Sequence, residues 1–102
     1  MTPAPAARLA ALGEGRFAVE GELLFRSVTK LDRAARKAFA GNAALEVDLA
    51  GVTRCDSAAL ALLLEWAGRA RRSGTTLRYR SLPSALLTIA AISEVEELLP
   101  RA

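Results

Sequence analysis

Cys55, Asp56 and Ser57 place a thiol, a carboxylate and a hydroxyl in a row, directly before the strongest helical pattern of the chain. Asp56 is well placed to cap that helix, because its carboxylate would accept free amides of the first turn at the positive end of the helix dipole. Capping explains Asp56 more simply than catalysis does. Ser57 would then expose its hydroxyl in the first turn, where free amides could receive a phosphate or an acceptor group of a partner.

Few other groups in the chain are suited to catalysis. The 102 residues include no histidine, which excludes the commonest general base. They include one cysteine, so neither an internal disulfide nor a Cys-based zinc site can form. Cys55 has no base partner and is expected to be a small buried apolar residue. Asp48 and Asp56 are the carboxylates near this point, and neither has a visible nucleophile–base pairing. No GxxxxGK phosphate loop occurs. We expect no enzyme activity, no cofactor and no metal.

The helix predicted over Ser57–Arg72 has two distinct sides at about 100° per residue. The core side holds Leu60, Leu63, Leu64, Ala67 and Ala70. The opposite side begins with Ala58, Ala61 and Leu62, a small flat apolar patch, and continues to Glu65, Arg69 and Arg72. An exposed apolar patch is a candidate partner site, with Thr53, Arg54 and Glu65 on its rim. The alternative is that a neighbouring loop covers it, and the residues alone leave both open.

The charge balance is mildly basic, with 14 Lys and Arg against 11 Asp and Glu, a net charge of +3. Five arginines lie between Glu65 and Glu94 with no acid among them: Arg69, Arg71, Arg72, Arg78 and Arg80. A solvated basic face is the favoured interpretation, because a nucleic-acid site would interleave aromatic residues and show a motif. The alternative is contact with the acidic surface of a protein partner or with lipid headgroups.

The order of predicted elements is strand, strand, helix, strand, helix, strand, helix, helix. Residues 1–15 are rich in Ala, Pro and Gly and are expected to form a flexible arm, with one domain over residues 16–102. We expect strands at Arg16–Glu20 and Leu23–Arg26, joined at Gly21 as a hairpin, and a helix capped by Ser27. Further strands are expected at Leu45–Leu49 and Thr76–Arg80, with a loop at 51–55. Strands alternating with helices predict an α/β fold with a mixed four-stranded sheet flanked by helices.

The first residues, Met1-Thr2-Pro3-Ala4-Pro5, do not have the basic segment and apolar core of a signal peptide. The longest apolar run, Ala58–Leu64, is far below the ~20 residues of a membrane span. We expect a cytoplasmic protein without direct membrane insertion.

The segment from Val47 to Leu63 resembles the central motif of STAS domains, the fold of sulfate transporters and anti-sigma-factor antagonists. In that family a strand of the type hDLxxV leads through a loop into D-S/T-x-G-L at the start of a helix, which Asp48-Leu49, Val52 and Asp56-Ser57 match. Val19–Leu23 is similar to the family's opening strands. The resemblance covers about Arg16 to Leu99 and implies a STAS fold.

Within that family the chain is most similar to the MlaB branch, small cytoplasmic subunits of phospholipid ABC transporters. Gly21–Phe25 and Ile92–Pro100 carry this second resemblance. It implies a non-catalytic subunit that binds the transporter's ATPase, supports its assembly and activity, lies at the inner membrane through that partner, and helps maintain outer-membrane lipid asymmetry. It also implies that the hydroxyl residue after the motif Asp, here Ser57, is important to the contact.

The chain departs from the signalling branch of the family. Phosphorylated antagonists typically carry the acceptor serine two residues after the motif Asp, and this chain has Ala58 there, followed by Ala59 in place of Gly. Partner switching with an anti-sigma kinase is therefore the alternative function, in which Ser57 would be a substitute acceptor with a different geometry.

Overall fold

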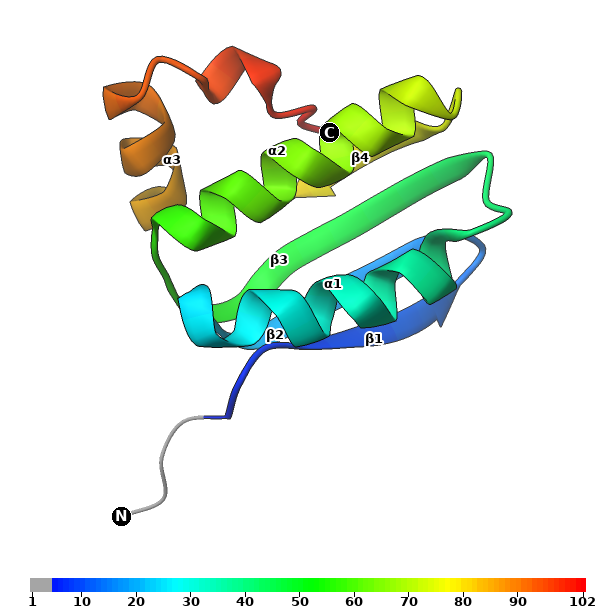
Figure 1. Ribbon diagram of the computed structural model, residues 1–102, viewed down its shortest axis with the longest axis horizontal. Coiled ribbons are helices and arrows are strands. Elements are labelled where there is room, and N and C mark those ends of the chain that lie inside the picture. Colours follow the sequence, from blue (N-terminus) through cyan, green and yellow to red (C-terminus); the bar gives the residue numbers. More distant parts are fainter. Residues whose placement is uncertain (1–4) are drawn as a thin grey trace.

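The computed structural model describes residues 5–102, which form one four-stranded sheet in the order β1-β2-β3-β4 (Figure 1). The strands are β1 (Arg8–Gly13), β2 (Arg16–Leu23), β3 (Ala44–Cys55) and β4 (Thr76–Arg80). The helices are α1 (Phe25–Phe39), α2 (Ser57–Arg72), α3 (Ser84–Ile92) and a 3-10 turn, η1 (Glu96–Leu98). β1 pairs antiparallel with β2, whereas β2–β3 and β3–β4 are parallel, so the expected mixed four-stranded α/β sheet is confirmed.

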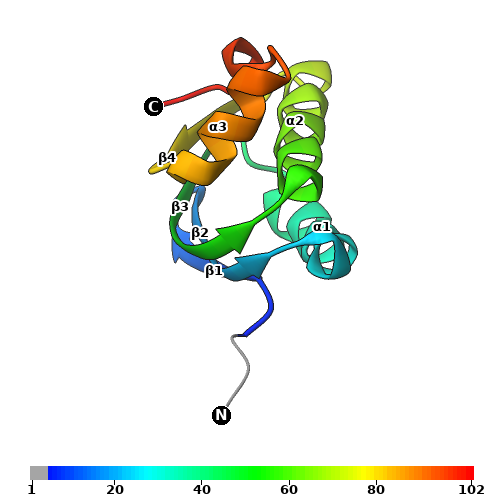
Figure 2. The ribbon, with the colours of Figure 1, turned by 90° about the vertical axis from the view of Figure 1, so that its left-hand side faces the viewer.

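Both long helices lie on one face of the sheet (Figure 2). The crossovers β2–α1–β3 and β3–α2–β4 step in the same direction across the sheet, and right-handed crossovers then place both helices on the same side. α1 and α2 run side by side in Figure 1 and begin at the same end of the molecule. This arrangement brings the two helix N-termini together.

The core lies between the sheet and these helices. Inward-facing strand residues alternate with polar ones, as a sheet with one covered face requires. The most deeply buried side chains are Val19, Leu23, Leu31, Val47, Leu49, Leu63, Tyr79 and Leu86. The hydroxyl of Tyr79 donates to the carbonyl of Leu63 at 2.7 Å, and burial raises the pKa of this phenol.

The first strand pair differs from the predicted hairpin. Arg16–Leu23 is one continuous strand that passes through Gly21, and its antiparallel partner is Arg8–Gly13, inside the segment expected to be an arm. The expected arm over 1–15 and the domain start at residue 16 are therefore wrong for residues 8–13, while residues 1–4 of that arm lie outside the described residues. Leu9 faces the core from β1, and this packing places the strand in the domain.

β3 is longer than predicted and includes the segment 51–55 that was expected to be a loop. Its pairing with β2 shifts register between Ala18 and Glu20, where β3 bulges. Asp48 stabilises the bulge, because its carboxylate accepts the Ala50 amide at 2.9 Å. The strand then resumes pairing and ends at Cys55, so it delivers Asp56 directly to the start of α2.

α1 begins at Phe25, before the expected cap at Ser27. Ser27 lies inside the first turn, where its Oγ accepts the Leu24 amide at 3.0 Å and donates to the Glu22 carbonyl at 2.9 Å. Its hydroxyl therefore ties the end of β2 to the first turn of the helix. Pro83 lies at the N-cap of α3.

Candidate functional site

The carboxylate of Asp56 joins the starts of both long helices. Oδ1 accepts the Ala58 and Ala59 amides at 2.9 and 3.3 Å, which confirms the predicted cap of α2. Oδ2 accepts the Phe25 amide, the first of α1, at 3.0 Å. Since its oxygens bind amides of this chain, Asp56 positions the site. Of the first-turn amides that were expected to receive a phosphate or an acceptor group of a partner, those of Ala58 and Ala59 are already bound by Asp56.

Ser57 is the first residue of α2 and is exposed. Within residues 5–102 its hydroxyl forms no hydrogen bond. It is therefore available to a partner. Ala61, one turn further along, is exposed too, and Ala58 is half-buried.

Leu62 does not lie on an open patch as expected. It is buried, with 7% of its surface exposed, because α1 lies alongside α2 and covers it. The predicted flat patch is instead a groove of about 380 Å³ between the two helices. Its lining comes from both helices and comprises Phe25, Val28, Thr29, Asp32, Ala58, Ala61 and Leu62. We call this the α1–α2 groove.

Phe25 stands at the edge of this groove with 79% of its surface exposed. Phe25 was expected within the strand Leu23–Arg26 and was not among the predicted site residues, whereas it is the first residue of α1. The available signal was the spacing of Phe25, Val28, Thr29 and Asp32, which repeats at three, four and seven residues and is typical of one helix face. A largely exposed phenyl ring beside small side chains is a typical anchor for a partner protein.

Two arginines flank the start of α1. Glu22 is buried, and its carboxylate pairs with Arg26 at 2.9 Å and with Arg54 at 3.4 Å. Thr53 and Arg54 are exposed and lie on the last residues of β3, not on a loop. A single buried carboxylate thus holds two guanidinium groups from different elements near the helix starts.

The far end of the groove is closed by an ionic cluster. Asp32 accepts the Trp66 indole N–H at 2.9 Å and two contacts from Arg69 at 2.8 and 2.9 Å. Burial alone would raise the pKa of Asp32, but hydrogen bonds from Trp66, Arg69 and Arg36 outweigh it and hold the pKa below its usual value. Glu65 is exposed and pairs with Arg69 at 3.3 Å. These contacts fix α1 to α2.

Cys55 does not provide a reactive group. It is half-buried, and burial together with the neighbouring Asp56 carboxylate raises the pKa of its thiol. A raised thiol pKa disfavours the nucleophilic thiolate. Among residues 5–102, no cluster of His, Cys, Asp and Glu could hold a metal ion, and no helix is long and apolar enough to cross a membrane.

A family model described as "Mlab, STAS domain" matches residues 7–100. The chain belongs to the STAS family. The match starts at residue 7 and so includes β1, in agreement with the structure. No curated protein matches the chain.

The STAS fold is also found by comparison with solved structures. The anti-sigma factor antagonist SpoIIAA, in its unphosphorylated form, is similar with a TM-score of 0.67 at 15% sequence identity, over 94% of this chain and 86% of that one. At this identity the likeness shows the fold alone. In this STAS domain the family motif lies where β3 delivers Asp56 to α2, beside the α1–α2 groove.

Proposed function

We propose that this STAS domain is a non-catalytic accessory subunit that binds and supports the ATPase of a phospholipid ABC transporter, which maintains outer-membrane lipid asymmetry. It would act in the cytoplasm, attached to the inner membrane through that partner. The match to the MlaB-type family model supports this assignment over other STAS functions. The half-buried thiol of Cys55 and the internally bound carboxylate of Asp56 are consistent with a role in binding instead of catalysis.

The observation that carries the proposal is the exposed start of α2 beside the α1–α2 groove. Ser57 and Ala61 are exposed, and no described residue fills the groove that Leu62 floors. Small side chains let a partner helix or loop approach closely, and Ser57 supplies a hydrogen bond. Fully burying Phe25 at such a contact would contribute roughly 1.5–3 kcal/mol.

The groove is too small to be a whole interface, since a stable complex buries about 800 Å² on each partner. Thr53, Arg54 and Glu65 surround the centre and extend the surface. Rim charges of this kind set register and encounter rate more than affinity. The partner surface would therefore combine an apolar centre with acidic residues opposite Arg26 and Arg54.

Co-purification with the ATPase encoded beside this gene tests the proposal. We expect Ser57→Arg to reduce ATPase recovery at least tenfold while the thermal unfolding midpoint stays near that of the wild type. Ser84→Arg is the matched control, because Ser84 is also an exposed first residue of a helix, α3, outside the groove. Equal recovery with Ser57→Arg and Ser84→Arg would show that the docking site is misplaced.

Partner switching is the second candidate, supported by the fold shared with an anti-sigma factor antagonist and by the exposed Ser57 hydroxyl. Incubation with ATP and the serine kinases encoded in the same genome distinguishes the two. Stoichiometric phosphate on wild type and none on Ser57→Ala would favour this alternative. A gene neighbourhood with permease and lipid-binding genes would favour transport.

A further inference from the structure

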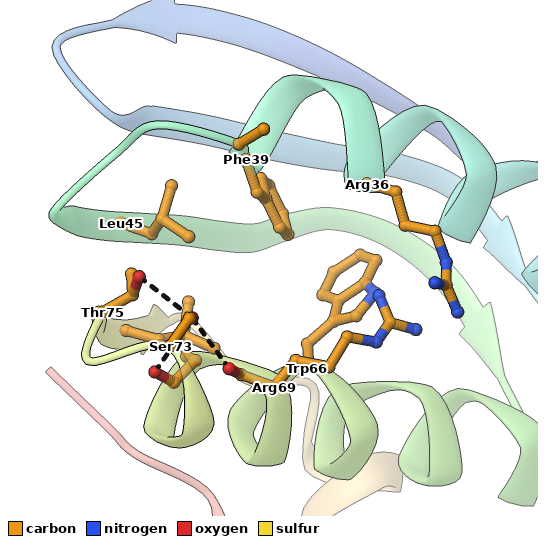
Figure 3. Close-up of a pocket in the computed structure, with 10 residues that line it drawn as sticks. Arg36, Phe39, Leu45, Trp66, Arg69, Ser73 and Thr75 are labelled. Carbon is orange, nitrogen blue, oxygen red and sulfur yellow. Dashed lines mark hydrogen bonds between the residues drawn. The ribbon is translucent and has the colours of Figure 1, made fainter.

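A second pocket lies at the opposite end of the α1–α2 pair, where both helices end above the sheet (Figure 3). It holds about 340 Å³, within the usual range of small-molecule sites of about 300–1,000 Å³. The residues that line it are Arg36, Phe39, Ala40, Leu45, Trp66, Arg69, Ala70, Ser73, Thr75 and Leu77. Neither the family motif nor the proposed docking surface includes this pocket.

Apolar side chains form most of the pocket lining. Phe39 and Trp66 stand edge to face with ring centroids 5.1 Å apart, and Leu45 and Leu77 of the sheet form the floor. Small side chains, Ala40 and Ala70, leave the space between the helix ends unfilled. Such a space favours an apolar group, because binding removes the apolar surface of that group from water.

Two cations, Arg36 and Arg69, are among the residues that line this pocket. The Arg36 side chain is 64% exposed, and within residues 5–102 Asp32 is its one ion-pair partner, contacted through Nε at 3.2 Å. Arg69 differs, because it is bound to Asp32 and Glu65. Of the two arginines that line the pocket, Arg36 is therefore the more exposed and makes fewer ion pairs.

We propose that this pocket binds a small amphiphilic anion, a medium-chain carboxylate whose chain lies against Phe39 and Trp66 and whose carboxylate pairs with Arg36. The planar guanidinium matches a carboxylate in geometry and charge. A mostly apolar lining with two arginines and no carboxylate selects against a cationic amphiphile and against a fully polar anion. The inference does not depend on the partner assigned to the α1–α2 groove.

Trp66 provides a built-in probe, since it is the chain's one tryptophan and lines the pocket. Titration with sodium decanoate below its micelle concentration should change Trp66 fluorescence saturably. Decyltrimethylammonium, with the same chain and the opposite charge, should bind at least tenfold more weakly, and acetate should give no change. Equal binding of the cationic amphiphile, or no saturable change with decanoate, would overturn the proposal.

Substitutions of residues that line the pocket test where decanoate binds. Ala70→Leu fills the pocket and should weaken decanoate binding at least tenfold; calorimetric titration avoids dependence on Trp66. Ala70 is buried, so the larger side chain can disturb folding. Ala40→Leu is the second variant, because it narrows the pocket from an exposed position, and it should also weaken decanoate binding.

The charge variants test the role of Arg36. Arg36→Gln should weaken decanoate binding about three- to tenfold, whereas Arg33→Gln, on the same helix outside the pocket, should not. Unchanged affinity in Ala40→Leu and Arg36→Gln would refute the location.

Discussion

At the scale of single residues, Asp56 performs two tasks with one carboxylate. It caps α2 through Ala58 and Ala59 and also accepts the first amide of α1 at Phe25. A helix leaves its first amides without partners, so one acidic side chain here stabilises two helix starts and fixes the distance between them. The exposed positions of Ser57 and Phe25 follow from that arrangement.

Replacing Asp56 with Ala should lower the free energy of unfolding by about 2 kcal/mol, near the upper end for loss of a helix cap, because three amides lose their acceptor. Urea denaturation measures the change. Asp48→Ala is the control, since it removes a carboxylate that accepts one exposed amide, that of Ala50, and it should cost less. If the two variants unfold at the same urea concentration, Asp56 does not join the helices as described.

Asp32 should make the free energy of unfolding depend on pH in the acidic range. Its pKa is lowered in the folded protein, so its contribution is present above the unfolded pKa of about 3.9 and is lost as pH falls through the folded value. Thermal unfolding from pH 5 down to pH 2.5 should show this loss, and Asp32→Asn should flatten the curve in that range. Glu65→Gln, which removes an exposed partner of Arg69, should keep the slope. An unchanged slope in Asp32→Asn would contradict the assignment.

At the scale of elements, Gly21 shows how a strand can include a residue that normally signals a turn. Its φ is +99°, and a Cβ placed on it would lie 2.7 Å from the Ala6 carbonyl oxygen. The segment before β1 returns beside β2 at this point, with the Glu22 amide donating to the Pro5 carbonyl at 3.0 Å. Glycine is needed because another backbone approaches closely.

Gly21→Ala should therefore destabilise the protein by more than the same change at Gly74. Both glycines have a positive φ, but a Cβ at Gly74 would meet nothing within 4 Å. Both variants incur backbone strain of about 1 kcal/mol, because alanine disfavours a positive φ. The additional loss of stability in Gly21→Ala measures the cost of the close contact with the Ala6 backbone. Denaturant unfolding of the two variants gives the difference. Equal destabilisation would show that the Pro5–Ala7 segment yields without cost.

The helices and strands differ in how well the sequence alone predicts them. α2 and β4 were predicted with their observed bounds, because periodicity and the cap at Asp56 are local signals. The pairing of β1 with β2 was missed, since Gly21 gives a local turn signal and its cause is a contact with Ala6, distant in sequence. Leu62 was misplaced for a similar reason: a wheel of one helix does not show that another helix covers it. The same limit hid Phe25 from the candidate site.

At the scale of the whole molecule, exposed charges are arranged differently on the sheet and on α1. The open face of the sheet carries charges that pair with each other, such as Arg8 with Glu20 and Arg80 with Glu46. The outer side of α1 instead carries four exposed cations, Arg26, Lys30, Arg33 and Lys37, of which the last three form no ion pair within residues 5–102. α1 therefore presents a row of exposed cations, and the same helix lines the α1–α2 groove.

The row of cations on α1 predicts how charge affects association with the proposed partner. Charges on a rim accelerate association more than they slow dissociation, and salt screens them over about 8 Å at physiological ionic strength. The double variant Lys30→Glu/Arg33→Glu should therefore slow association with the ATPase about three- to tenfold at low salt, with little change in dissociation. Surface plasmon resonance at several salt concentrations separates the two rates, and the salt dependence of association should weaken in the variant.

Arg16→Glu/Arg78→Glu is the matched control, because it changes the net charge equally on exposed residues of the opposite sheet face. It should affect association much less if the position of the charge matters. Ser57→Arg should act differently again, mainly by raising the dissociation rate, because it disturbs the centre of the contact where short-range packing holds the complex together. Equal slowing of association by the two double variants would mean that net charge alone steers the encounter and that the partner does not approach over α1.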